Sequence, residues 1–278
     1  MLGKGGVGKT TVATALTALA AKRGLRARRV ELGSAASVRK LDDDALVLDP
    51  DQALEDAATP VFGSRTLARA ALGNAAFSRL LEVLPGLREY AMLLAAVDLT
   101  RSLGGGAYDR VIVDMPATGH GVSWLAAAER FARLVPRGRS REQADRLDGT
   151  LRDPAKTAFV VVSLAEPLVL SETLELRGEL EAHLGRDADR LVVNRMPSAP
   201  PIRAADAARA ESRSPARSQA QSAALSKLAS WLDVRSGPQR FARDATHGIP
   251  STWLAEFVGE PDLGAICRAL STLEAGSP

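Results

Sequence analysis

Cysteine is almost missing from this chain of 278 residues, which contains Cys267 alone. One cysteine excludes a disulfide framework and a multi-cysteine metal site within a single chain. Long apolar runs are missing as well. The longest one, residues 90–97, is far shorter than the ~18 residues of a membrane-spanning helix. The opening residues Met-Leu-Gly-Lys-Gly-Gly also lack the apolar segment of a secretory leader. We therefore expect a cytoplasmic protein without direct membrane insertion.

Aromatic residues make up only 4% of the chain, and no basic stripe accompanies them. The net charge is +3, with arginines and acidic residues interspersed along the sequence. Nucleic-acid-binding proteins typically cluster their basic residues on one face, so we expect no nucleic-acid partner. The length suffices for one large α/β domain or two small ones, and a chain of this size buries roughly three quarters of its unfolded surface.

Lysine is scarce too, with six lysines against thirty arginines, yet two lysines stand within the first nine residues. Residues 3–11 read GKGGVGKTT and match the phosphate-loop pattern G-x-x-x-x-G-K-[ST]. Glycines let backbone N–H groups wrap a phosphate, and the following helix points its positive end at the anion. Lysine then contacts the β/γ-phosphates, while the hydroxyl after it ligates Mg²⁺. The nucleotide-binding residues predicted here are Gly3, Gly5, Gly6, Val7, Gly8, Lys9, Thr10 and Thr11.

The position of this loop raises a difficulty. A phosphate loop normally follows the carboxyl end of a buried strand, but only Met1 and Leu2 precede Gly3. If nothing precedes them, we expect a poorly anchored loop and weakened nucleotide affinity.

Strand and helix patterns alternate along the rest of the chain. Strands are predicted at residues 28–32, 45–48, 110–113, 157–162 and 189–193. Helices are predicted at residues 11–22, 64–101 with breaks at 73–74 and 85–86, 168–184, 223–231 and 262–273. This alternation predicts an α/β fold with a mostly parallel sheet and helices on both faces. We expect one P-loop domain over residues 1–278, with a small helical subdomain at about 60–105 and 124–152. The Ala-, Arg-, Ser- and Pro-rich stretch at about 197–222 is expected to be exposed and flexible.

Two segments suggest a family. A lysine directly after the first glycine, Lys4, resembles the deviant Walker A loop of the MinD/ParA/ArsA branch of P-loop ATPases. Residues 108–125, YDRVIVDMPATGHGVSWL, resemble the ArsA pattern in which a strand delivers an aspartate before a Pro/Thr/Gly/His turn. Residues 151–180 and LVVNRM at 191–196 are similar to later segments of that family. The chain therefore resembles the arsenite-pump ATPase (ArsA) and tail-anchored-protein-targeting ATPase family.

The resemblance implies ATP and Mg²⁺ as cofactors and assigns roles to individual residues. Lys4, Lys9 and Asp114 would be catalytic, with Lys4 reaching across a dimer, and Thr10 and Asp114 would hold the metal. Glu172 would contact nucleotide or the dimer partner, and Asn194 would read adenine. His120 is either part of a γ-phosphate switch, with Pro116, Thr118 and Gly119, or a polar loop residue.

The chain departs from the family at several positions. Gly33 stands where the family's water-orienting aspartate should be, and Ala36 where its histidine should be. Orienting the general base typically contributes 10²–10⁴-fold in rate, so we expect slow ATP hydrolysis unless Glu31 or Asp42 to Asp44 compensate. Cys267 alone cannot bind arsenite or clamp zinc as the family's cysteines do. No methionine-rich insert follows Asp114, although the helices containing Met92 could form a small groove.

We therefore expect an ArsA-like, ATP-binding dimeric switch that acts on a protein client, as a homodimer or with a paralogous ATPase. One alternative is a non-hydrolysing scaffold. Another is a ParA/MinD-type positioning ATPase.

Overall fold

The computed structural model describes residues 1–33, 45–75, 84, 86–100, 106–116, 121–135, 137–196, 202–256 and 262–271. Its strands form two parallel sheets with the orders β2-β1-β3 and β4-β5-β6. These strands are β1 (Ala27–Leu32), β2 (Ala45–Leu48), β3 (Arg110–Asp114), β4 (Val160–Leu164), β5 (Arg190–Met196) and β6 (Ser251–Ala255). The predicted parallel α/β architecture is therefore confirmed.

The first two residues join the two sheets. The Met1 nitrogen donates to Val113 O of β3 at 2.7 Å, and Met115 N donates to Met1 O at 3.3 Å. On the other side, Leu2 N donates to Val160 O and Val162 N donates to Leu2 O, both at 2.9 Å. The expectation of a poorly anchored loop is thus wrong, because hydrogen bonds to both neighbouring strands hold these two residues. Leu2 is also fully buried.

Helices cover both faces of the sheets because the buried strands are apolar on both sides. Val161 and Val193 contribute to one core, which includes residues of α5 (Leu87–Asp98) and α9 (Pro167–Leu184). Val162 and Val192 contribute to a second core with α1 (Lys9–Lys22) and α12 (Leu263–Ser271). Successive residues of a strand point to opposite faces, so a continuous apolar run suits a strand that is covered twice.

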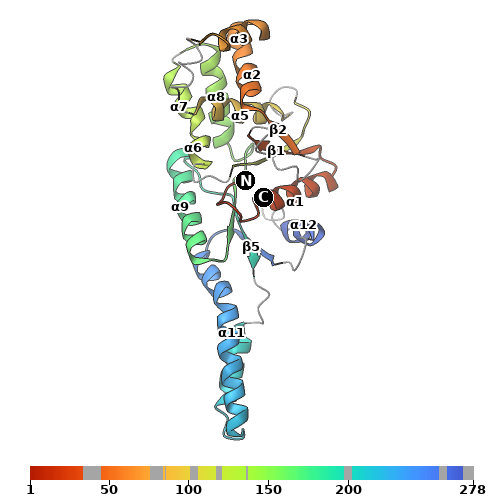
Figure 1. Ribbon diagram of the computed structural model, residues 1–278, viewed down its shortest axis with the longest axis vertical. Helices are drawn as coiled ribbons and strands as arrows, with labels where there is room; N and C mark the ends of the chain where they lie inside the picture. The colour runs from red at the N-terminus through yellow and green to blue at the C-terminus, as the bar shows by residue number, and fades with distance from the viewer. Residues whose placement is uncertain are drawn as a thin grey trace.

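A group of helices lies beyond the β2 edge, at the top of Figure 1. It contains α2 (Pro50–Phe62), α3 (Arg65–Leu72), α5, α6 (Gly121–Leu125), α7 (Ala127–Leu134) and α8 (Arg139–Arg152). Tyr90 of α5 stacks on Phe131 of α7, with ring centroids 4.4 Å apart. Helix α2 begins at an Asp49 cap, whose side chain accepts from the N–H groups of Asp51 and Gln52. No helix was predicted from the sequence at the position of α2.

Several predicted boundaries are wrong. Helix α10 (Ile202–Ser212) lies within the 197–222 stretch, and α11 (Gln219–Ala245) begins there at a Ser218 capping box rather than at residue 223. The strand expected at 157–162 runs from Val160 to Leu164, and the one expected to end at 193 continues through Asn194 to Met196. Strand β6 was not predicted. Within the described residues, no helix is long and apolar enough to span a membrane.

Candidate nucleotide-binding site

The loop of residues 3–8 leaves the Leu2 bridge and enters α1, packed against the carboxyl ends of β4 and β5. Gly3 and Gly8 have φ values of +136° and +93°. A Cβ atom on Gly3 would lie 2.3 Å from Val162 O, and one on Gly8 would lie 2.3 Å from Asn194 Nδ2. Both glycines therefore allow a close approach that no side chain permits. Gly5 and Gly6 are exposed at the outer bend, and Thr11 is half-buried in the first turn of α1.

Val7 and Asn194 fasten this loop to the sheet. The Val7 side chain is buried in the core between α1 and α12. Asn194 Nδ2 donates to Val7 O at 2.8 Å, and Asn194 Oδ1 accepts from Arg195 N at 2.9 Å. The sequence predicted nucleotide contacts for Val7 and Asn194 and gave no indication of these structural roles. One amide hydrogen and one oxygen lone pair of Asn194 remain for a ligand.

Lys9 folds back over the loop that precedes it. Its ammonium donates to Gly3 O at 3.0 Å and to Lys4 O at 2.9 Å, and the residue is only 7% exposed. Burial lowers the pKa of Lys9, while the nearby Asp114 carboxylate acts in the opposite direction. A buried cation beside a ring of backbone N–H groups makes the loop suitable for an anionic ligand.

Thr10 and Asp114 come together from elements 104 positions apart. Thr10 Oγ1 donates to Asp114 Oδ2 at 2.6 Å. Asp114 is 8% exposed, and its buried Oδ1 has no hydrogen-bond partner in the part of the chain that the structure describes. Unsatisfied buried carboxylate oxygens are costly, and Mg²⁺ is often held by one carboxylate, a hydroxyl and nucleotide phosphates. These two residues therefore fit a metal bound together with a nucleotide.

Among the described residues, no larger acidic metal site competes with this pair. The described residues contain no group of three or more His, Cys, Asp or Glu side chains able to hold a metal ion. Any Mg²⁺ at the loop would therefore complete its coordination with phosphate oxygens and water.

Lys4 and Glu172 form an ion pair at the surface of the loop. Lys4 Nζ lies 2.7 Å from Glu172 Oε1 of α9, and both side chains are partly exposed. The structure thus brings together two residues, 168 positions apart, that were predicted separately. Sequence spacing contained no signal for this contact.

The two switch segments are only partly described. Gly33 directly follows β1 with φ of +153°, and its N–H donates to Leu48 O at 3.4 Å. The Glu31 carboxylate lies 2.5 Å from the Arg29 guanidinium, so an ion pair already engages this possible substitute for the missing aspartate. Ala36, Asp42 to Asp44, Thr118, Gly119 and His120 lie outside the described residues.

Comparison with known proteins agrees with this geometry. Residues 1–196 match the family described as "CobQ/CobB/MinD/ParA nucleotide binding domain". ATPase BagA of Mycobacterium tuberculosis and "Putative ATPase Mb3704" of Mycobacterium bovis are each 26% identical to the chain over 216 residues. Each alignment covers 69% of this chain and 63% of the relative, so the chain spans less than two thirds of these proteins' length. The chain belongs to the family of CobQ/CobB/MinD/ParA nucleotide-binding domains.

Proposed function

We propose that this protein binds ATP with Mg²⁺ at the residue 3–10 loop and works as a nucleotide-dependent dimeric switch of the ArsA type. The observation that carries the proposal is the Thr10–Asp114 contact beside the buried Lys9 ammonium, in which a buried carboxylate oxygen has no hydrogen-bond partner among the described residues. The match to a nucleotide-binding family and the ATPase names of the two relatives support it.

Each residue of the loop has a definite task in this proposal. Backbone N–H groups of residues 5–10 surround the phosphates, which the positive end of α1 also attracts. Lys9 exchanges its bonds to Gly3 O and Lys4 O for phosphate oxygens, which are stronger acceptors. When bound, Mg²⁺ neutralises phosphate charge. Thr10 and Asp114 would hold the ion, since Asp114 Oδ1 lacks a hydrogen-bond partner among the described residues.

Hydrolysis by the chain alone is proposed to be slow. Gly33 supplies no carboxylate where the ArsA pattern has one, and Arg29 already pairs with Glu31. A glycine cannot orient a water molecule, so the contribution of about 10²–10⁴-fold from a positioned base is lost.

Dimerisation is proposed to exchange the Lys4–Glu172 ion pair within one chain for contacts across two chains. Exposed pairs of this kind contribute at most about 1 kcal/mol, so ATP phosphates and a second subunit could readily displace it. The second subunit is another copy or a paralogous ATPase that restores the missing aspartate. The closed dimer would present a surface to a protein client.

The first test measures ATP binding with Mg²⁺ by titration calorimetry on unmodified protein, Lys9→Ala and Lys22→Ala. Lys22 lies at the other end of the same helix and is exposed, so its variant controls for loss of a lysine. We expect Lys9→Ala to weaken binding about 10- to 100-fold, because charge-assisted hydrogen bonds contribute about 1.5–3 kcal/mol. Equal affinities in all three proteins would contradict the proposal.

A second test measures turnover of unmodified protein, Gly33→Asp and Gly63→Asp. Gly63, at the end of α2, also has positive φ, so its variant reports backbone strain without a new carboxylate near the site. Faster turnover in Gly33→Asp alone is expected if the strand end relaxes enough to accept a side chain.

The competing hypothesis is a non-hydrolysing scaffold, which Gly33 favours. An unmodified chain that binds no ATP would establish the scaffold and end the switch proposal.

A further inference from the structure

Helices α10 and α11 form a hairpin that extends away from the sheets, at the bottom of Figure 1. Its own small core consists of Ala208, Ala229 and Leu232. The outer part of the hairpin lies far from the nucleotide site, as the figure shows. Internal packing of this size does not explain why the hairpin is so long. Contact of its surface with a partner would explain the length.

One face of α11 is apolar although it is exposed. Leu228, Trp231 and Val234 follow one another at intervals of three residues, which places them along one side of the helix. Their exposed fractions are 45%, 52% and 77%. Such a contiguous apolar strip on a folded protein commonly marks an interaction site.

Positive charge gathers on the same hairpin. Residues 202–245 contain eight Lys and Arg against four Asp and Glu, a net charge of +4 where the whole chain has +3. Arg209 pairs with Asp206 and Asp233, and Arg217 pairs with Glu211. Arg213 and Lys227 are exposed, and neither has an ion-pair partner in the described parts of the chain. These two cations remain available to a partner.

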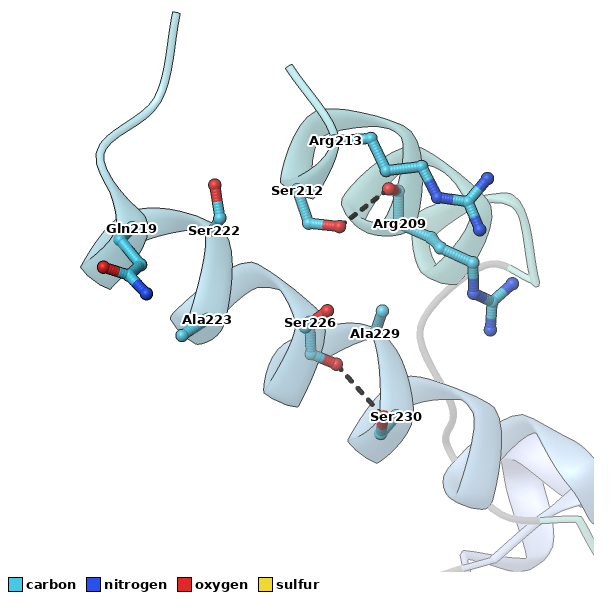
Figure 2. Close-up of a pocket in the computed structure, with 9 residues that line it drawn as sticks. All are labelled: Arg209, Ser212, Arg213, Gln219, Ser222, Ala223, Ser226, Ala229 and Ser230. Atoms are coloured by element: carbon cyan, nitrogen blue, oxygen red, sulfur yellow. Dashed lines mark hydrogen bonds between the residues drawn. The ribbon is translucent and has the colours of Figure 1, made fainter. Parts of the chain in front are cut away.

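A shallow groove of about 530 Å³ lies between the two helices. Figure 2 shows the guanidinium group of Arg209 on α10 near that of Arg213, which directly follows this helix, with Ser222, Ser226 and Ser230 spaced along α11. Hydroxyl and guanidinium groups donate hydrogen bonds to carboxylates. The groove and the apolar strip lie on neighbouring sides of α11. Ser230 of the groove directly precedes Trp231 of the strip, while Ala229 faces the core of the hairpin.

We propose that this hairpin surface docks an acidic, amphipathic helix of a partner protein. Carboxylates of that helix would meet Arg213, Lys227 and the groove serines Ser222 and Ser226, because the Ser230 hydroxyl already donates to Ser226 O. The apolar side of the helix would cover Trp231 and Val234. A concave groove bordered by an apolar strip suits a helix better than a flat lipid surface. As the client-facing surface of the switch, the hairpin rests on the proposed function.

The test uses the full chain and a synthetic helical peptide with glutamates on one face and leucines on the other. Fluorescence anisotropy of the labelled peptide is measured with unmodified protein, Arg213→Glu, Val234→Ser and Arg137→Glu. Arg137 is exposed elsewhere on the surface, so its variant controls for one reversed charge. A peptide with lysine in place of glutamate controls for apolar binding alone.

We expect binding that weakens about tenfold or more in Arg213→Glu and Val234→Ser, stays unchanged in Arg137→Glu, and weakens at high salt. Binding should persist in Lys9→Ala without ATP, so failure of the nucleotide proposal is recognised separately. No binding, equal binding of both peptides, or equal binding by all variants would overturn the inference. Preference for vesicles of anionic phospholipid over the peptide, or self-association lost in Val234→Ser, would overturn it in favour of another occupant.

Discussion

Replacing Gly8 by alanine tests whether the phosphate loop is held by a direct contact with β5. The φ angle of +93° places Gly8 in the left-handed region, where a side chain costs about 1–2 kcal/mol. The added Cβ would also lie 2.3 Å from Asn194 Nδ2, so the amide must move away from Val7 O. Leaving that buried carbonyl without its partner costs about 1–3 kcal/mol. We expect Gly8→Ala to lower the free energy of unfolding by about 2–5 kcal/mol.

Gly6→Ala is the matched control. Gly6 has φ of +80°, and no atom lies within 4 Å of its hypothetical Cβ. This variant should therefore lose only the backbone contribution of about 1–2 kcal/mol. Asn194→Ala removes the obstructing amide, so the double variant Gly8→Ala/Asn194→Ala should lose about 1–3 kcal/mol less than the sum of the two single variants.

Urea unfolding, followed by circular dichroism, measures all four differences. Equal losses in Gly8→Ala and Gly6→Ala would refute the argument, because the contact with Asn194 would then contribute nothing. Strict additivity in the double variant would refute it as well.

Three further predictions concern other parts of the molecule. Tyr90 is buried, and its hydroxyl has no hydrogen-bond partner among the described residues; Tyr90→Phe should therefore leave the free energy of unfolding unchanged or raise it by about 1 kcal/mol. Burial raises the pKa of Tyr90 above its usual value of 10.0, so the free energy of unfolding of the unmodified protein should fall as pH rises above that value. Tyr90→Phe should remove the decrease that ionisation of this hydroxyl causes, and an identical alkaline profile in the variant would contradict the burial argument. Leu2→Ala should lower the free energy of unfolding by about 2–5 kcal/mol in the same urea assay, because truncating a fully buried leucine leaves a cavity in the core. A loss below about 1 kcal/mol would mean that the Leu2 side chain contributes little to this core. Glu172→Gln should change the free energy of unfolding by less than about 1 kcal/mol, because both side chains of the Lys4–Glu172 ion pair are partly exposed. The variant should nevertheless alter the ATP-dependent dimer population in sedimentation velocity, and an unchanged population would contradict the proposed exchange of this pair.

Local patterns were sufficient for the fold class. The runs VIV at 111–113 and LVV at 191–193 are short, apolar and bounded by polar residues, which is typical of strands covered on both faces. The glycine spacing of the loop predicted a turn into a helix, which the structure has as α1. Boundaries were less certain because strand ends depend on pairing with neighbours, so β5 continues through Asn194 beside β4 and β6.

Elements with weak local signals were missed. Strand β6, with the sequence STWLA, has only five residues and forms because β5 offers an open edge. Helix α10 lies in a stretch rich in Ala, Arg and Ser, where it packs against α11. In both cases the stabilising partner is distant or follows later in the chain.

The sequence alone determined which chemistry the first residues could perform, because glycines, lysine and threonine at fixed spacing suffice to describe a phosphate loop. Spacing along the chain holds no information about which distant side chains meet. Folding decided that Asp114 meets Thr10, that Asn194 fastens Val7, and that Leu2 joins two sheets. The physical reason is that parallel strands far apart in sequence place their carboxyl ends at one edge of the sheet, so contacts over a hundred positions depend on strand order.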